Sequence, residues 1–478
     1  MTLGKKRLYF AFLIVSCINV KAQGISDFNA FRDQMLNNYQ SYKESILENY
    51  ETYIKTTWNE YQLMKGHGVK MHKPITVPDV SVMPIASNSN NILVDPLSVD
   101  TSTISKIIPC KNIQLVPSLG NKENCQIDFY GQSILLPKKI IRMKDFSFNN
   151  KQIAFYWRKL IDDGWEEIAG ILYDYKQKYN YNDYMLFLLT QNYVREIVED
   201  ENQRNLLSHY LMVACGYDVR IGRIDDSLVL LLPFKEQLYS RLFIIQGDRY
   251  FYLFANQEMS SLNKLWTYEV PYKNNDLQCL NVQLIGSPKL PYNGCSFHIT
   301  DGQLSISGKV NLNLIKLLDV LPQMDNKFYV TPVLDERCRK EIIESLRCQL
   351  KDKSLNDKLS MLLHFVQYAF RYATDNNQFG KEKPFFFEEL LYYPQCDCED
   401  RSVFFIYLVQ ELLNLDCHLL IYPSHIAVSI AIEGASGNYY VFDNKKFYIA
   451  DPTYLGASIG DCMPNYAHVT PRVITLKQ

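Results

Sequence analysis

The chain has 478 residues, of which 47% are hydrophobic and 21% are charged. This balance allows a sizeable core and excludes a chain that is disordered throughout. At roughly 150 residues per domain, the length predicts about three structural units. Fifty lysines and arginines stand against 52 aspartates and glutamates, with no basic cluster, which argues against nucleic acid as a partner.

The N-terminus has the pattern of a secretory signal peptide over residues 1–22. Basic residues at 5–7 precede a mostly apolar stretch over 8–20, which is short for a membrane span, and a small-residue cleavage site ends at Ala22. We therefore expect an exported protein, periplasmic or secreted. In the alternative, the four residues ending at Cys17 resemble a bacterial lipobox, and lipidation of Cys17 would anchor the protein to a membrane.

The cysteine count bears on this export. Removing the predicted signal peptide removes one of the 12 cysteines and leaves eleven, so an oxidising compartment leaves at least one thiol free or shared between chains. Cys398 is the candidate for the free thiol. Cys110 with Cys125, and Cys279 with Cys295, have spacings that a hairpin could bridge. The alternative is that most of these thiols are simply buried.

A predicted helix and a predicted linker come next. In residues 23–65, aromatic and aliphatic side chains recur every three or four positions, which predicts one long amphipathic helix over 27–65. Its aromatic stripe needs a surface to cover it, either on this chain or on a partner or second copy. Residues 66–104 contain four prolines and a polar tract at 87–91, which predicts a linker.

A mixed middle region follows. Residues 105–257 contain short β-rich runs, a helical stretch over 150–215, and clearer β-rich runs over 217–256. Residues 258–348 are a mixed connecting region that includes one short predicted helix. Helical periodicity returns over 336–376 and leads into the C-terminal domain. The whole pattern predicts an α+β protein.

The C-terminal domain, residues 349–478, carries the clearest chemical signal. The turn Asp397-Cys398-Glu399-Asp400 leads into an apolar run over 403–413 that predicts a helix. A cysteine in the first helical turn feels the positive end of the helix dipole and nearby backbone N–H groups, and both favour the thiolate. Asp397 and Glu399 oppose this by repulsion, so the thiol needs a basic partner.

His425 and Asp451 are placed to complete a triad with that cysteine. His425 opens a predicted strand over 426–432, and Asp451 ends another over 447–450. Adjacent antiparallel strands can place the two side chains next to each other. The imidazole can then take the thiol proton, while the carboxylate sets the tautomer and holds the ring.

These three motifs, Asp397-Cys398-Glu399-Asp400, His425 and Asp451-Pro452-Thr453, resemble the transglutaminase-like superfamily of papain-fold cysteine enzymes. The resemblance covers about 105 of the 478 residues and has the motifs in the family's order. It implies a papain-like domain in which Cys398 is the nucleophile, His425 the base and Asp451 the residue that orients it. One departure is Cys396, where family members often have a small residue; a bridge to Cys396 could mask or regulate the site.

The resemblance implies acyl transfer through a Cys398 thioester, with a protein or peptide as substrate. Water as the acceptor makes the enzyme a peptidase or amidase, which we favour, and an amine makes it a transglutaminase. No metal or organic cofactor is expected. The other functional class is an inactive transglutaminase-like module that serves as a binding or envelope scaffold.

Further residues are candidates for the cleft. The Cys398 backbone N–H can form one half of an oxyanion hole, and Gln378 is the candidate for the other. Asp400 is expected to brace the helix start rather than to do chemistry, and Tyr454 to line the cleft. A zinc site is the competing chemistry, from the four possible ligands Cys396, Cys398, His418 and His425. Its C-x-C and H-x6-H spacing is not a usual zinc pattern.

The middle region contains a pattern similar to the C-terminal domain. A shift of 197 residues brings helix and strand runs of 150–257 onto those of the catalytic region. It also places Glu201 at the position of Cys398, Leu228 at that of His425 and Phe254 at that of Asp451. This predicts a degenerate second copy of the fold without catalytic groups. Few residues are identical, so chance similarity of helix and strand patterns is the alternative.

Overall fold

The computed structural model describes residues 95–97, 124–139, 141, 156–157, 159–224, 227–254, 265–267, 277–330 and 334–476. The predicted signal peptide, the lipobox alternative at Cys17, the 27–65 helix and Cys110 lie outside these residues. The chain divides into two compact units, 1–66 and 67–478, and every described residue belongs to the second. None of the described helices combines the length and the apolar character needed to cross a membrane.

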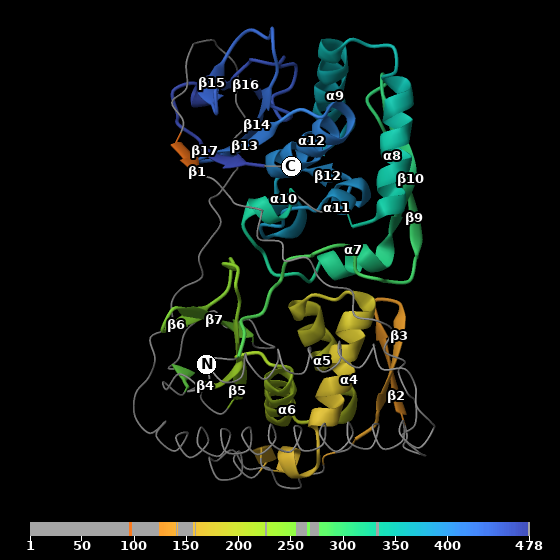
Figure 1. Ribbon diagram of the computed structural model, residues 1–478, viewed down its shortest axis with the longest axis vertical. Coiled ribbons are helices and arrows are strands. Elements are labelled where there is room, and N and C mark those ends of the chain that lie inside the picture. Colours follow the sequence, from red (N-terminus) through yellow and green to blue (C-terminus); the bar gives the residue numbers. More distant parts are fainter. Residues whose placement is uncertain are drawn as a thin grey trace, which may run out of the picture. The chain divides into compact units, whose positions relative to one another are not determined.

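The described chain is a mixed α+β structure with mainly antiparallel sheets, as predicted (Figure 1). Its first part begins with a hairpin and continues with three helices and a five-stranded sheet of order β6-β7-β5-β4-β8. The elements are β2 (Asn124–Phe129), β3 (Gln132–Pro137), α4 (Glu166–Tyr179), α5 (Asp183–Ile197), α6 (Glu201–Ala214), β4 (Arg220–Ile224), β5 (Ser227–Pro233), β6 (Phe243–Gln246), β7 (Arg249–Phe254) and β8 (Leu265–Trp266).

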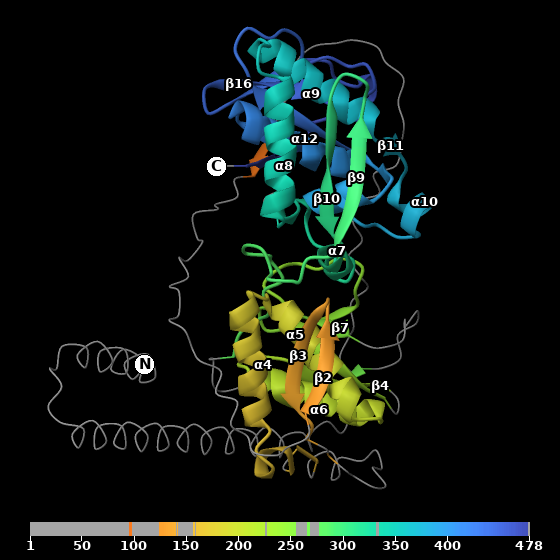
Figure 2. The same ribbon diagram turned by 90° about the vertical axis from the view of Figure 1, so that its right-hand side faces the viewer.

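The second part begins with a hairpin that runs along a helix (Figure 2). Helices and short parallel strands then lead to the helix that starts at Cys398. These elements are β9 (Gly294–Thr300), β10 (Ser305–Asn311), α7 (Leu312–Leu318), η2 (Asn326–Phe328), α8 (Glu336–Gln349), α9 (Leu355–Ala369), β11 (Arg371–Tyr372), α10 (Asp375–Phe379), α11 (Phe387–Tyr392), β12 (Gln395–Cys396) and α12 (Cys398–Leu413).

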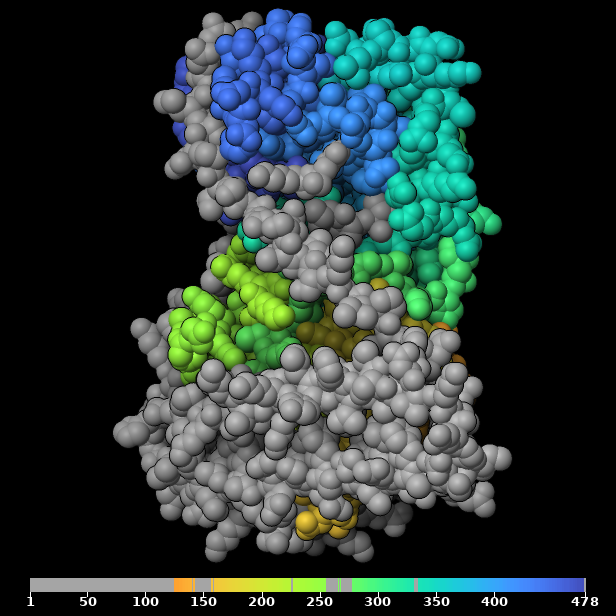
Figure 3. Space-filling view, viewed as in Figure 1, coloured from red at the N-terminus to blue at the C-terminus, as the bar shows by residue number. Residues whose placement is uncertain are grey.

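A six-stranded sheet of order β1-β17-β13-β14-β16-β15 completes the chain. Its strands are β1 (Asp95–Leu97), β13 (Cys417–Tyr422), β14 (His425–Ala431), β15 (Tyr439–Phe442), β16 (Lys445–Ala450) and β17 (Arg472–Thr475), with η3 (Pro464–Tyr466) before the last strand. Figure 3 shows the α8–α9 segment in cyan beside the blue surface of the C-terminal strands.

The centre of this sheet is covered on both faces, which explains the continuous apolar run of β14. Helix α12 packs on β13 and β14 and buries Phe404, Phe405 and Leu408. An apolar cluster that includes Ala427 and Tyr466 covers the other face. Because both faces of β14 are buried, its register and its first residue, His425, are strongly specified.

One part of the predicted linker takes part in a sheet, although its prolines are expected to break any regular element. Residues 95–97 form β1, which pairs in parallel with β17. β1 is the edge strand of the sheet, which is where proline is found in sheets because the missing N–H can face solvent. The pairing depends on a contact distant in sequence, which local composition does not reveal.

The two large sheets have one strand order in common. Order β6-β7-β5-β4-β8 corresponds to β15-β16-β14-β13-β17, and each sheet follows a helix, α6 or α12, whose first residues are 197 positions apart. Leu230 lies opposite Phe254 in β5–β7. A shift of 197 residues turns this pair into Ala427 opposite Asp451. That is the β14–β16 register continued by one residue beyond Val428 opposite Ala450. The agreement therefore extends from element order to sheet topology.

Glycine is required where two loops cross beside β16. Gly460 donates its N–H to the carbonyl of Ile449 at 2.7 Å and accepts from the N–H of Asn438 at 2.7 Å. Its φ of +93° lies in the left-handed region, and a Cβ at this position would overlap the carbonyl oxygen of Ser436. The crossing holds the loop between β14 and β15 against the chain that follows Asp451.

A buried glutamate in α11 makes stability depend on pH. Glu388 is 0% exposed, and one carboxyl oxygen accepts the N–H groups of Leu334 (2.6 Å) and Asp335 (2.8 Å). The other oxygen has no partner among the described residues. Burial raises the pKa of Glu388 from 4.5 to about 7. Folding therefore favours the protonated form.

Glu388→Gln is expected to flatten the dependence of stability on pH. The pKa of Glu388 is about 7 in the folded protein, against 4.5 for the free group. Its contribution to the free energy of unfolding is therefore present in full below about pH 4.5 and is lost as the pH rises through 7. Between about pH 5 and pH 8 the wild type should lose about 2–3 kcal/mol of unfolding free energy through this group. Urea unfolding at several pH values measures it. Glu344→Gln, at an exposed position in α8, is the control, and parallel curves for wild type and Glu388→Gln would contradict the expectation.

Candidate active site

Two aspartates define the start of α12. Asp397 is the N-cap residue, and its Oδ1 accepts the backbone N–H groups of Glu399 (3.1 Å) and Asp400 (3.5 Å). Asp400 completes a capping box, since its Oδ2 accepts the N–H of Asp397 at 3.2 Å, while its Oδ1 accepts the N–H of Phe385 at 2.8 Å. Both oxygens of Asp400 are thus used by backbone groups, which are the contacts of a bracing residue.

His425 and Asp451 form a buried pair. Nε2 of His425 lies 2.7 Å from Oδ2 of Asp451, and the side chains are 3% and 2% exposed. Oδ1 of Asp451 accepts the N–H groups of Thr453 (2.9 Å) and Tyr454 (3.1 Å). The β14–β16 register explains the contact: continued by one residue it sets Ala427 opposite Asp451, and His425 is the next residue on that face of β14. Because Nε2 is engaged, Nδ1 is the nitrogen left to accept a proton.

Cys398 is held beside the start of β14. It is the first residue of α12 and is 1% exposed. The backbone N–H of Ile426, the residue after His425, is directed at the thiol. One helical turn later, the hydroxyl of Ser402 donates to the carbonyl of the same Ile426 at 3.2 Å. The two contacts fix the helix start to the strand start, and with it Cys398 to the neighbourhood of His425.

The thiol and the imidazole are not hydrogen-bonded at rest. Over the residues that the structure describes, Cys398 and His425 share no hydrogen bond, and Nδ1 of His425 has no hydrogen-bond partner. Burial, followed by the carboxylates of Asp397 and Glu399, raises the pKa of the Cys398 thiol well above its ordinary value, against the opposing N–H of Ile426. The repulsion by Asp397 and Glu399 that the sequence indicates is thus joined by desolvation, and together they outweigh the influence of the helix start on the thiol.

Two buried residues that sequence reasoning missed support the triad. Gln367 in α9 is 2% exposed, and its Nε2 donates to the carbonyls of Asp451 (3.1 Å) and Tyr454 (2.9 Å). Arg401 in α12 donates to the carbonyl of Gln367 (3.2 Å) and to that of Phe370 (2.7 Å). The chain Arg401–Gln367–Asp451 links the helix that starts at Cys398 to the backbone of Asp451. The sequence shows an arginine three residues after Cys398, but it does not show that this arginine is buried or which carbonyls it contacts.

Two tyrosines complete the surroundings. The ring of Tyr466 stacks on His425 with a centroid distance of 5.3 Å, and its hydroxyl lies 2.8 Å from Oγ of Ser424. This contact restricts rotation of the imidazole. Tyr372 in β11 has its pKa raised by burial and then by Cys398, which places its phenol in the electrostatic range of the thiol. Neither residue stood out in the sequence.

The remaining cleft candidates, Gln378 and Tyr454, make no side-chain hydrogen bond to Cys398, His425 or Asp451 among the described residues. Gln378 is half-buried in α10, and its side chain makes no hydrogen bond to any described residue. Nothing in the structure brings it to Cys398. Tyr454 directs its backbone N–H to Asp451 while its ring packs at the edge of the apolar cluster on the sheet.

The described cysteines are all free thiols. Cys396 is buried and its sulfur points at the carbonyl of Arg371 at 3.9 Å, so it does not bridge to Cys398. Cys279 and Cys295 are not joined either, and Cys295 lies opposite Val310 in the β9–β10 hairpin.

The alternative zinc ligands are not brought together. His418 contacts the hydroxyl of Tyr440 at 2.7 Å and stacks on Phe447 at 3.9 Å, as a packed core histidine does. Over the described ranges, the one group of side chains close enough to hold a metal ion is Asp375, Asp397 and Glu399. It contains none of the zinc candidates.

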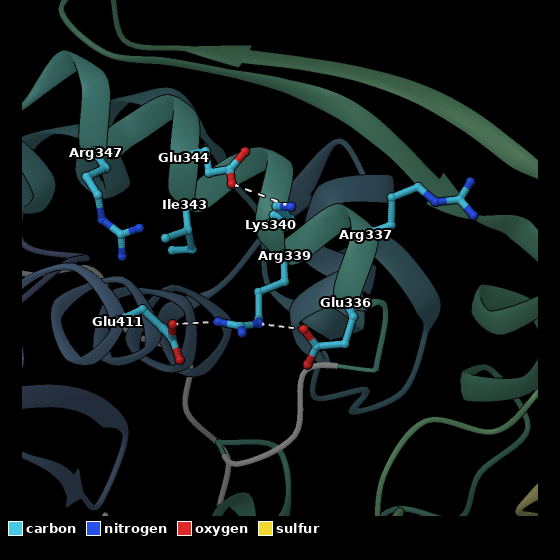
Figure 4. A pocket seen from close by; sticks show the side chains of 8 residues that line it. All are labelled: Glu336, Arg337, Arg339, Lys340, Ile343, Glu344, Arg347 and Glu411. Carbon is cyan, nitrogen blue, oxygen red and sulfur yellow. Dashed lines mark hydrogen bonds and ion pairs between the residues drawn. The ribbon is translucent and has the colours of Figure 1, made fainter.

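An open surface pocket of about 500 Å³ lies along α8, away from the triad (Figure 4). Charged side chains line it, and Arg339 pairs there with Glu336 (2.9 Å) and with Glu411 (2.7 Å). Glu411 is 13 residues after Cys398, or roughly 20 Å along the same helix. The pocket therefore presents charged side chains, several of them paired with one another, and none of the candidate catalytic residues.

The corresponding positions of the first sheet carry no triad. Glu201 is exposed at the start of α6, and Leu228 is buried in β5. One supporting contact does have a counterpart: Nδ2 of Asn205 donates to the carbonyl of Leu228 at 2.8 Å, as Ser402 does to Ile426. This sheet keeps a helix-to-strand contact and lacks nucleophile, base and carboxylate.

Comparisons with protein-family models, with curated proteins and with solved structures find no match for this chain.

Proposed function

We propose that this protein is an exported cysteine acyl-transfer enzyme of the transglutaminase-like type, with a papain-like catalytic domain in residues 349–478. The observation that carries the proposal is the buried His425–Asp451 pair at 2.7 Å, set beside a cysteine at the start of a helix. A histidine oriented by a carboxylate, next to a thiol, is the constellation of nucleophilic acyl transfer.

The reaction proceeds by general-base catalysis, since the resting group is a thiol. As Sγ of Cys398 attacks the amide carbonyl carbon, its proton passes to Nδ1 of His425, and Asp451 stabilises the imidazolium. The C–N bond then breaks, and the leaving amine takes the proton from His425. Water, deprotonated by His425, attacks the thioester, and the acid and the free thiol are released. An amine in place of water gives transamidation.

The 1% exposure of Cys398 sets a condition on this chemistry. A peptide carbonyl reaches the sulfur only when neighbouring chain gives way, and the thiol and Nδ1 must approach each other in the same step. The burial of Cys398 and the absence of a thiol–imidazole hydrogen bond among the described residues also fit the second candidate, an inactive binding or scaffold module. In such a module the five-stranded sheet would serve as a packing partner or a substrate platform.

A peptide-library screen with mass spectrometry tests the proposal. The wild type is expected to cleave a subset of peptides and to carry an acyl group on Cys398, and an added primary amine should divert part of the product to the amide. Cys398→Ala should abolish both signals, and the matched variant Cys396→Ala should keep them. A wild type that gives no more product than Cys398→Ala, and no adduct, would favour the binding module.

A further inference from the structure

Three acidic side chains from two separate elements meet beside α12. Asp375 is the first residue of α10, Asp397 caps α12, and Glu399 lies in its first turn. Each offers a carboxylate oxygen, and these oxygens all lie within 4.8 Å of one another. The residues are only 3%, 4% and 2% exposed, so water does not screen their repulsion.

Glu399 distinguishes this group from an ordinary capping cluster. Asp375 accepts the backbone N–H of Lys383 at 2.5 Å, and Asp397 accepts the N–H groups at the helix start. By contrast, both carboxyl oxygens of Glu399 are buried and have no hydrogen-bond partner among the described residues. One of them lies within 4.8 Å of a carboxylate oxygen of Asp375 and of one of Asp397. A buried carboxylate without any hydrogen-bond donor is strongly unfavourable unless a proton or a cation accompanies it.

The neighbouring basic side chains, Arg401 and Lys383, bind to groups other than Glu399. The guanidinium of Arg401 donates to the carbonyls of Gln367 and Phe370. Lys383 pairs with Glu389 and, at 3.1 Å, with Asp319. Glu382 and Asp400 add further negative charge around Glu399. Burial raises the pKa of Asp375 and of Asp397, and Lys383 and Arg401, respectively, oppose that rise. No lysine or arginine among the described residues forms an ion pair with Glu399.

We propose that Asp375, Asp397 and Glu399 bind a divalent cation of calcium size. Oxygens that share a Ca²⁺ ion lie about 2.3–2.6 Å from it and therefore up to about 5 Å from one another, which the observed separations meet. An all-oxygen set of three carboxylates suits a hard cation, and a site without nitrogen or sulfur ligands disfavours zinc. The ion would join the N-terminus of α12 to α10. The group of ligands does not include the thiol of Cys398.

Calorimetric titration of the chelator-treated full chain with CaCl₂ tests the site. The expected result is one binding event per chain and a melting temperature that rises with the logarithm of the free Ca²⁺ concentration. Glu399→Gln keeps the side-chain shape, removes the unpaired charge and should weaken binding at least tenfold. Asp375→Asn, outside α12, should do the same and serves as the second variant. Glu411→Gln, near the other end of α12, is the matched control and should bind like wild type.

Three outcomes would overturn the proposal. The first is no heat and no shift in melting temperature up to about 10 mM Ca²⁺, which is tenfold above the weakest affinities of extracellular calcium sites. The second is unchanged affinity in Glu399→Gln or in Asp375→Asn. The third is binding of Mg²⁺ with no binding of Ca²⁺, which would contradict the size of the ion. Acyl transfer is tested separately, by the comparison of the wild type with Cys398→Ala.

Discussion

Asp451→Asn is expected to lower the rate of amide cleavage by about 10⁴-fold while Cys398 and His425 remain in place. The reason is the tautomer of His425. Oδ1 of Asp451 accepts two backbone N–H groups, from Thr453 and Tyr454, so the oxygen of an asparagine must take that position. Its NH₂ group then faces Nε2 and donates to it. The ring proton moves to Nδ1, and His425 cannot accept the proton of the thiol.

Steady-state kinetics on a peptide identified in the library screen measures this effect across pH. Asp461→Asn is the matched control, because Asp461 lies in the same loop, where its carboxylate accepts the N–H of Ser458 at 2.8 Å and does not touch His425. Circular dichroism and melting temperature check that both variants fold. An Asp451→Asn rate within tenfold of wild type would show that Asp451 does not set the state of His425.

Gly460→Ala is expected to destabilise the protein by about 2–5 kcal/mol. Two costs add: a non-glycine residue in the left-handed region costs about 1–2 kcal/mol, and a backbone shift to relieve overlap costs about 1–3 kcal/mol. The overlap arises because the new Cβ would meet the carbonyl oxygen of Ser436. The crossing also holds Ile449, two residues before Asp451, so the loss should extend to the triad.

Gly434→Ala separates the two costs. Gly434 also has a left-handed φ, +76°, but a Cβ there would meet nothing within 4 Å. It should therefore lose only about 1–2 kcal/mol. Urea unfolding of both variants measures the difference. Equal losses at the two positions would mean that the loop crossing tolerates a side chain and that only the backbone conformation matters.

Much of the local structure follows from the sequence, because the signals are short-range. The Asp397 cap and the apolar run after it predict α12, and alternation and turn residues predict the strands that begin at His425 and end before Asp451. The order of these elements is enough to suggest that Cys398, His425 and Asp451 share a neighbourhood. The helix and strand pattern over 150–257 is likewise local, and the structure has the corresponding elements there.

The features that depend on distant contacts came only from the tertiary structure. Which nitrogen of His425 meets Asp451, and which carbonyls Gln367 and Arg401 hold, depend on side-chain directions that packing decides. The same is true of β1, whose partner strand is more than 370 residues later.

The pKa of the Cys398 thiol also depends on packing. The sequence shows both the helix start and the opposing carboxylates of Asp397 and Glu399, but the burial that raises the pKa most comes only from the fold. Likewise, Asp375 joins Asp397 and Glu399 only because the chain returns to the start of α12 after 22 residues. The sequence determined which reactive groups and which helices and strands the protein has. Their charge states and mutual distances were decided by tertiary packing, since desolvation and long-range contact exist only in the folded chain.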